Sequence, residues 1–134
     1  MAHRHVLDTH ALIWYLEGNP RLGQDAKRVM DDPRSELVLP VIALAEAAFI
    51  VERGRTSIPD VNSLLNVVQA DPRLEIYPLN LEVFQQTLRA TTVPEMHDRQ
   101  IVATALHLRA LGHVVSILTK DDSIATASLV PIVW

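Results

Sequence analysis

Cysteine is absent from the sequence, which excludes a disulfide-stabilised scaffold and any metal site built on thiolates. Aromatic residues make up only 4% of the chain, too few for an extended surface on which successive nucleobases could stack. No apolar run approaches the ~18 residues of a membrane-spanning helix. At the start of the chain, Asp8 soon interrupts a short apolar run, so a signal peptide is not predicted. We expect a soluble, cytoplasmic protein with no membrane association.

An excess of positive charge is also lacking. The chain has 12 Lys and Arg against 16 Asp and Glu, a formal net charge of −4 at pH 7. This balance argues against a protein that holds nucleic acid mainly by bulk electrostatic attraction. It does not exclude a nuclease, because clustered active-site carboxylates lower the net charge and a bound cation would reverse the local sign. Composition therefore leaves the partner open.

The chain contains enough residues for one domain with a buried core, 134 in total, of which 49% are hydrophobic. No repeat or linker divides it, so residues 1–134 are predicted to form a single domain. Short apolar runs alternate with longer helical patterns. Strands are predicted at 5–8, 37–40, 75–79 and 114–118, with an edge strand in 129–134, where Pro131 cannot donate to a central ladder. Helices are predicted near 9–17, 22–32, 41–53, 60–70, 81–92, 98–111 and 121–128.

Strands that alternate with helices predict an α/β fold, a three-layer α/β/α sandwich with a central parallel sheet of four to five strands. The nearly continuous apolar character of residues 114–118 is typical of a strand covered on both faces. Open sheets of this kind bind ligands at the carboxyl ends of their strands. Functional side chains are therefore expected where the strands end.

Three aspartates stand at strand ends or helix starts. Asp8 follows the first predicted strand, Asp121 follows the fourth, and Asp98 opens the predicted helix at 98–111. Aspartate is also a preferred helix N-cap, and capping alone could explain each of the three.

Glu46 has no such explanation, because it falls inside a predicted helix. Its neighbours three and four residues away are all apolar: Ile42, Ala43, Phe49 and Ile50. An acid on an apolar face is costly unless it is paired or bound to a cation. Pairing with Arg53, two turns along, and exposure to solvent are the alternatives to a functional role.

Carboxylates gathered in one pocket repel each other unless a divalent cation lies among them. Oxygen ligands without cysteine suit Mg²⁺ or Mn²⁺ better than a structural zinc ion. Such an ion lowers the pKa of a bound water and stabilises charge on a phosphoryl oxygen. The residues themselves thus predict a Mg²⁺-dependent phosphoryl-transfer or hydrolysis site.

Four segments, in this order and spacing, resemble the PIN-domain family and, within it, the VapC-type toxin ribonucleases of bacterial toxin–antitoxin pairs. They are residues 7–14 (LDTHALIW), 44–47 (LAEA), 94–105 (PEMHDRQIVATA) and 118–121 (LTKD). The resemblance covers nearly the whole chain. It implies an α/β/α sandwich whose acidic pocket binds one or two Mg²⁺ or Mn²⁺ ions and cleaves RNA endonucleolytically.

The resemblance also implies roles for individual residues. Asp8, Glu46 and Asp98 would form the metal-binding catalytic core, with Asp121 as a fourth acid, and Thr9 and Thr119 would support them. Two positions depart from the family pattern. Val41 stands where many members have a small hydroxyl residue. The pair Asp121-Asp122 leaves the fourth acid open; Asp121 is preferred for its offset from Thr119, and Asp122 is interpreted as a cap.

Four basic residues near the predicted acids could hold RNA phosphates: Arg53, Arg55, Arg99 and Lys120. For each of them, a solvated charge on the surface is the alternative. The predicted helix at 41–53 is apolar almost all the way round, which predicts burial on more than one side and hence a partner. The resemblance supplies two candidate partners, a second copy of the chain and a VapB-like antitoxin that covers the acidic pocket.

The predicted mechanism is in-line attack of a metal-activated water on an RNA phosphodiester, which leaves 5′-phosphate and 3′-hydroxyl ends. One alternative is a PIN-like interaction domain without catalytic activity. Another is a phosphatase of the haloacid-dehalogenase type, but that chemistry needs a second aspartate two residues after Asp8, and His10 occupies this position.

Overall fold

Five parallel strands form one sheet in the computed structural model, which describes residues 3–134. The spatial order is β3-β2-β1-β4-β5. The strands are β1 (His3–Leu7), β2 (Glu36–Pro40), β3 (Leu74–Tyr77), β4 (Val114–Leu118) and β5 (Ile132–Val133). The chain leaves β1 in one direction to build β2 and β3, then returns to build β4 and β5 on the other side. The strand order therefore reverses between β1 and β4, where such sheets form a ligand-binding crevice.

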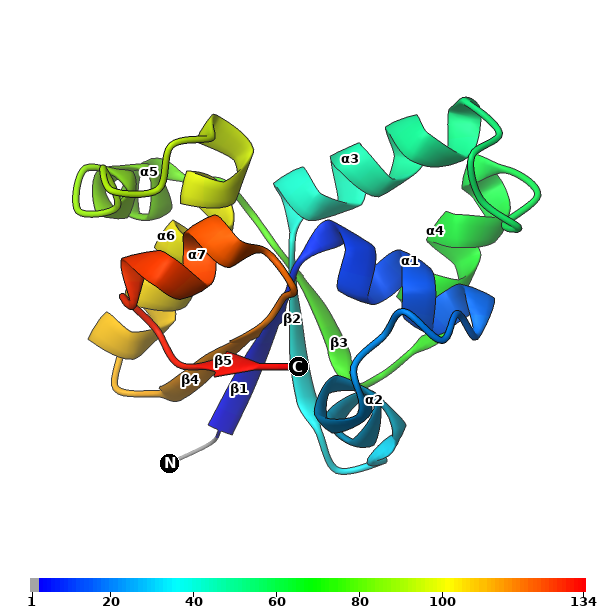
Figure 1. Cartoon of the computed structure of the whole chain (residues 1–134), viewed down its shortest axis with the longest axis horizontal. Helices are drawn as coiled ribbons and strands as arrows, with labels where there is room; N and C mark the ends of the chain where they lie inside the picture. Colours follow the sequence, from blue (N-terminus) through cyan, green and yellow to red (C-terminus); the bar gives the residue numbers. More distant parts are fainter. Residues whose placement is uncertain (1–2) are drawn as a thin grey trace.

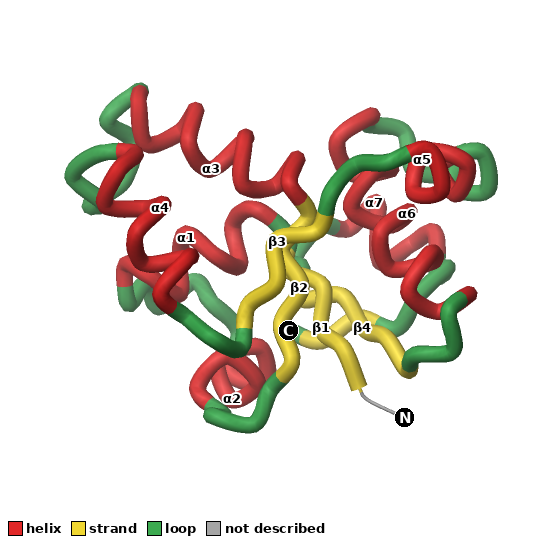
Figure 2. The backbone as a smooth tube through the Cα atoms, turned by 180° about the vertical axis from the view of Figure 1, so that it is seen from behind, coloured by secondary structure: helices red, strands yellow, loops and turns green. Residues whose placement is uncertain are grey.

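Helices cover both faces of this sheet (Figure 1, Figure 2). On one side lie α1 (Thr9–Glu17), α2 (Gln24–Asp31), α3 (Val41–Glu52) and α4 (Val61–Ala70). On the other lie α5 (Leu81–Thr87), α6 (Met96–Ala110) and α7 (Asp122–Ala127). The predicted α/β/α sandwich is confirmed. Within residues 3–134, no helix combines the length and the hydrophobicity that crossing a membrane would need.

The central strands are buried on both faces, as their apolar sequences predict. Val6, Leu7 and Val38 are among the residues with no exposed surface. The edge position of the last strand is also confirmed, since β5 pairs with β4 alone. Pro131 contributes its carbonyl there, which accepts a hydrogen bond from the Ile117 amide at 2.9 Å.

The segment between α5 and α6 differs from the prediction. The helix predicted for 81–92 ends at Thr87, and residues 88–95 form turns. Ala90 and Val93 are fully buried in this segment, and Pro94 disfavours a helical conformation at the residue before it. The next helix starts at Met96 and not at Asp98, because the side chain of Glu95 caps it.

Within the described chain, the fully buried residues of α3 lie on one face, and burial of a second side by a partner stays a prediction. Ala43, Ala47 and Val51 face the core. On another face, Val41 and Phe49 are 39% and 54% exposed. This apolar face is available to a partner or a ligand.

Gly23 provides a test of how the last strand packs. Its φ of −63° suits any residue, but a Cβ there would lie 2.4 Å from the main-chain carbon and oxygen of Trp134. The same Trp134 oxygen accepts hydrogen bonds from the amides of Asp25 (3.1 Å) and Ala26 (3.3 Å).

Gly23→Ala should therefore lower the free energy of unfolding by roughly 1–3 kcal/mol, the usual cost of overpacking, as measured by urea denaturation. Without this contact the substitution would stabilise the protein by about 0.4–1 kcal/mol, because alanine restricts the unfolded chain. An unchanged or increased stability would contradict the packing of Trp134 on Gly23.

Candidate metal-binding active site

The four acids singled out in the sequence come from different elements and meet at the carboxyl edge of the sheet. Asp8 follows β1 and Asp121 follows β4, the two strands between which the strand order reverses. Glu46 lies on α3, which begins directly after β2, and Asp98 lies in the first turn of α6. The negative charges of the other three acids contribute to the raised pKa of Asp98, which indicates that the four carboxylates lie near one another.

Asp8 is 9% exposed and both of its carboxylate oxygens accept hydrogen bonds. Oδ1 accepts from the amide of Thr9 and Oδ2 from the hydroxyl of Thr119, each at 2.6 Å. An N-cap accepts from the second or third residue of the helix, whereas Asp8 accepts from the first. Burial raises the pKa of Asp8, although the hydrogen bonds from Thr119 and Thr9 oppose this rise. Asp8 is the N-cap residue of α1, but capping alone does not account for it, because its Oδ2 accepts from Thr119 outside the helix.

The two threonines connect Asp8 to other acids. The Thr9 hydroxyl donates to Glu46 Oε1 at 3.2 Å, and the Thr119 hydroxyl accepts a hydrogen bond from the Asp121 amide at 3.0 Å. Thr9 and Thr119 are 2% and 1% exposed. Their buried hydroxyls thus fix how the strand ends and α3 are arranged around the site.

Asp98, unlike Asp8, is not at the N-cap position of its helix. Glu95 is the cap, and its Oε2 accepts from the Asp98 amide at 2.9 Å. Burial raises the pKa of Asp98 to about 7, and the negative charges of Asp121, Asp8, Glu95 and Glu46 add to this effect. A carboxyl group in this position gains most from a nearby cation.

Asp121 has a capping role as well as a place in the site. Its Oδ1 accepts from the amides of Ser123 (2.8 Å) and Ile124 (3.2 Å) at the start of α7. Burial opposes ionisation, but hydrogen bonds from Ser123 and Ile124 outweigh it and lower the pKa of Asp121. Asp122 is exposed in the first turn of the helix. The interpretation of Asp122 as the cap is wrong, because Asp121 caps the helix while lining a hollow with Asp8.

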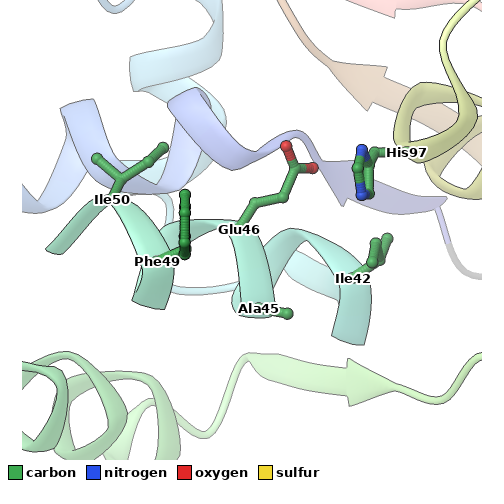
Figure 3. Close-up of a pocket in the computed structure, with 6 residues that line it drawn as sticks. All are labelled: Ile42, Ala45, Glu46, Phe49, Ile50 and His97. Carbon is green, nitrogen blue, oxygen red and sulfur yellow. The ribbon is translucent and has the colours of Figure 1, made fainter. Parts of the chain in front are cut away.

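Glu46 is partly buried on α3, and its carboxylate faces His97 (Figure 3). Burial raises its pKa and Asp8 adds to the rise, whereas His97 and the hydrogen bond from Thr9 lower it. Within the described residues, no ion pair joins Glu46 to Arg53, whose guanidinium lies over the Phe49 ring at 4.4 Å. Pairing with Arg53 therefore does not explain Glu46.

The donor set fits a hard divalent cation in type and in charge. Four carboxylates offer oxygen ligands, and their mutual repulsion, which adds to burial in raising the pKa of Asp98, is the condition that a cation relieves. The four carboxylates do not form a complete coordination shell in their present conformations. Across residues 3–134, no three His, Asp or Glu side chains are grouped closely enough to hold an ion as they stand.

The predicted RNA-binding residues occupy different settings. Lys120 lines the same hollow as Asp8 and Asp121, with its ammonium 5.9 Å from the Trp14 ring. Arg53 stacks on Phe49, and Arg55 lines a separate hollow beside α1. Arg99 donates to the carbonyls of Val93 and Thr91, so its guanidinium holds the turn between α5 and α6.

Glu95 was missed from the sequence. It caps α6, hydrogen-bonds His97 Nδ1 at 2.6 Å through Oε1 and adds negative charge beside Asp98. A signal for it exists, since Glu95 precedes Asp98 by three residues, the spacing between a helix cap and the amide that it accepts from. His10 was not assigned to the site from the sequence, yet it lines the hollow with Asp8.

Fold and site together define a class of protein: a parallel α/β domain with clustered carboxylates at the point where strand order reverses. The model of the PIN domain matches residues 5–128. The chain therefore belongs to the PIN-domain family, as the resemblance predicted. This membership sets aside the haloacid-dehalogenase alternative.

Two solved structures share this fold. The structure of VapBC2 from Rickettsia felis bound to a DNA fragment from their promoter has a TM-score of 0.66 and 12% identity, and the alignment covers 96% of each chain. That of FitAcB from Neisseria gonorrhoeae has a TM-score of 0.66 and 18% identity, covering 96% of this chain and 95% of the other. A comparison with curated proteins gives no significant match.

The pKa of Asp98 leads to a prediction about stability. Its value of about 7 in the folded protein exceeds its ordinary 3.8, so the folded state binds this proton more tightly than the unfolded chain. Ionisation of Asp98 therefore does not affect the free energy of unfolding below pH 3.8. It lowers the free energy of unfolding increasingly between pH 3.8 and 7, and the full loss is reached above pH 7.

Asp98→Asn should consequently stabilise the metal-free protein at pH 8 by roughly 1–2 kcal/mol, after discounting for the partial exposure of the carboxyl, and the gain should disappear near pH 4. Urea denaturation with a chelator present measures both. Asp122→Asn, which removes an exposed acid nearby, is the matched control and should not reproduce the gain. If Asp98→Asn is less stable than wild type at pH 8, the ionised Asp98 carboxylate does not destabilise the fold, and its raised pKa is contradicted.

Proposed function

We propose that the protein is a Mg²⁺- or Mn²⁺-dependent endoribonuclease of the VapC type, acting in the cytoplasm as the toxin of a toxin–antitoxin pair. The observation that carries the proposal is the convergence of Asp8, Glu46, Asp98 and Asp121 at the reversal point of a PIN-domain sheet. Asp8 and Asp121 stand at N-cap positions, but capping does not explain the hydrogen bond from Thr119 to Asp8, nor Glu46 or Asp98. The raised pKa of Asp98 supports a site built to receive positive charge.

In this proposal the four acids would hold one or two ions, which would supply an activated water and neutralise charge on the phosphodiester. The chain's own contribution is positional. Thr9 and Thr119 hold the Asp8 carboxylate in one orientation, and Glu95 holds the first turn of α6 and with it Asp98. Lys120, in the hollow beside Asp8, is placed to contact an RNA phosphate.

A non-catalytic interaction domain is the second candidate. Two observations favour it: Asp121 already serves as a cap, and residues 3–134 hold no preformed ligand cage. The buried hydrogen-bond network around Asp8 favours the enzyme, because an interaction domain has no need to hold an acid in an environment that raises its pKa.

Asp8→Asn distinguishes the two candidates. Loss of a residue that merely orients a metal ligand costs about 10–100-fold in activity, so loss of the ligand itself should reduce RNA cleavage by at least about 100-fold in Mg²⁺ or Mn²⁺. Asp122→Asn is the matched control and should cleave at the wild-type rate. Cleavage by Asp8→Asn at the wild-type rate, with its fold intact by circular dichroism, would rule out the enzymatic proposal.

The chemistry of the product ends provides a separate prediction. Attack by water displaces the 3′-oxygen and leaves 5′-phosphate and 3′-hydroxyl ends. Attack by the neighbouring 2′-hydroxyl would instead leave a cyclic 2′,3′-phosphate. Mass spectrometry of cleaved oligonucleotides separates these outcomes, and cyclic phosphate ends would contradict the mechanism.

The antitoxin and the second copy are proposed partners, and each has a candidate surface. Between α3 and α4 lies an apolar hollow of about 260 Å³ lined in part by Val41, Ala45 and Leu65, suited to the apolar face of an amphipathic antitoxin segment. On α5, Leu81 and Phe84 are 64% and 52% exposed, which supports a homodimer.

We expect light scattering to show a dimer when the protein is measured by itself and a larger complex when the antitoxin is added. A monomer in both measurements would contradict both partners.

A further inference from the structure

A cavity of about 400 Å³ opens beside Glu46, between α3 and the first turn of α6. Its lining residues are Ile42, Ala45, Glu46, Phe49, Ile50 and His97 (Figure 3). Of the four acids of the proposed active site, Glu46 alone is among them. The cavity is therefore separate from the hollow that contains Asp8 and Asp121 but shares one carboxylate with the site.

The lining has two chemically different parts. Figure 3 shows the Glu46 carboxylate between the Phe49 ring and the His97 imidazole. Ile42 and Ile50 contribute apolar surface. A planar group with an apolar face and a polar edge matches this arrangement, because its face can pack on Phe49 while its edge meets His97.

Both parts of the lining are held in place. The guanidinium of Arg53 lies 4.4 Å from the Phe49 ring centre, and Arg53 is not among the lining residues, so it packs on the ring from outside the cavity. His97 Nδ1 is engaged by Glu95 Oε1 at 2.6 Å, which leaves Nε2 to meet a ligand. A rigid aromatic ring and an oriented imidazole are the elements with which proteins bind single-stranded bases.

We propose that this cavity receives the nucleobase next to the scissile phosphate of the RNA, with Phe49 stacking on the base and His97 contacting its edge. The inference rests on the proposed ribonuclease function and adds the residues that select where the RNA is cut. Because one ribose joins a base to its phosphate, a phosphate beside Glu46 carries its base to the adjoining cavity. A side chain of a second copy is the rival occupant.

Phe49→Ala tests the proposal and Val67→Ala is its matched control, since the two side chains are 54% and 49% exposed and Val67 lies on α4, outside the cavity. The substrates are short RNAs with one cleavage site that differ only in the nucleotides flanking it. Wild type should discriminate among them at one flanking position. Phe49→Ala should raise KM about 5- to 160-fold with a smaller change in kcat, because the ring does not touch the reacting atoms. It should also lose the discrimination, because an unstacked base is no longer held with its edge against His97.

Two further variants sharpen the outcome. Phe49→Tyr keeps the stacking ring and should keep the discrimination, and Val67→Ala should match wild type. If wild type cleaves RNA and Phe49→Ala retains both its discrimination and its KM, the base-binding role is overturned while the ribonuclease remains. The same conclusion follows if Phe49→Ala shifts the oligomeric state in light scattering but leaves discrimination intact, since the cavity then serves an interface between copies.

A binding measurement separates failure of this inference from failure of the proposed function. Fluorescence anisotropy compares the affinity of a labelled RNA for Asp8→Asn with its affinity for the double variant Asp8→Asn/Phe49→Ala. Weaker binding by the double variant supports the cavity whether or not wild type cleaves RNA, and equal binding overturns it. Absence of cleavage by wild type in Mg²⁺ and Mn²⁺ would count against the proposed function alone.

Discussion

The hydrogen bond from the Thr119 hydroxyl to Asp8 Oδ2, 2.6 Å long, joins the ends of the two strands between which the sheet reverses its order. The rest of the site depends on it. Thr119 also accepts from the Asp121 amide, and on the opposite side of Asp8 the Thr9 hydroxyl reaches Glu46. One buried chain of hydrogen bonds therefore positions three acids, and it can do so because parallel strands β1 and β4 end side by side.

This arrangement concentrates negative charge that the fold does not neutralise. The pKa of Asp98 rises to about 7 through burial and the neighbouring carboxylates. Natural folds tolerate such strain where function requires it, and a divalent cation is the simplest species that relieves four carboxylates together. Hydrogen bonds lower the pKa of Asp121, whereas burial raises that of Asp8, so the acids are not equivalent before any ion is present.

Much of this could be predicted from the sequence. Alternating strand and helix patterns determine the sheet, and Glu46 could be recognised because an acid inside an apolar helix has no capping role. The faces of α3 could not be distinguished, since Ala43 and Ala47 repeat with the same spacing as Val41 and Ala45, and only tertiary packing decides which pair is buried. The end of α5 depends on the burial of Val93, which is a long-range effect. Whether the acids act together depends on the distances between their side chains in space, and the spacing of the residues along the sequence does not give these distances.

The central claim is that the acids share one electrostatic site that a divalent cation relieves. The most direct test is to follow the carboxyl carbon of Asp98 by NMR as a function of pH, in the chelated protein, in Asp121→Asn and after addition of Mg²⁺. Asp98 should titrate near pH 7 in the chelated protein, and its pKa should be lower both in Asp121→Asn and with Mg²⁺. Titration of Asp98 near pH 4 in the chelated protein, unchanged by Asp121→Asn and by Mg²⁺, would contradict this claim.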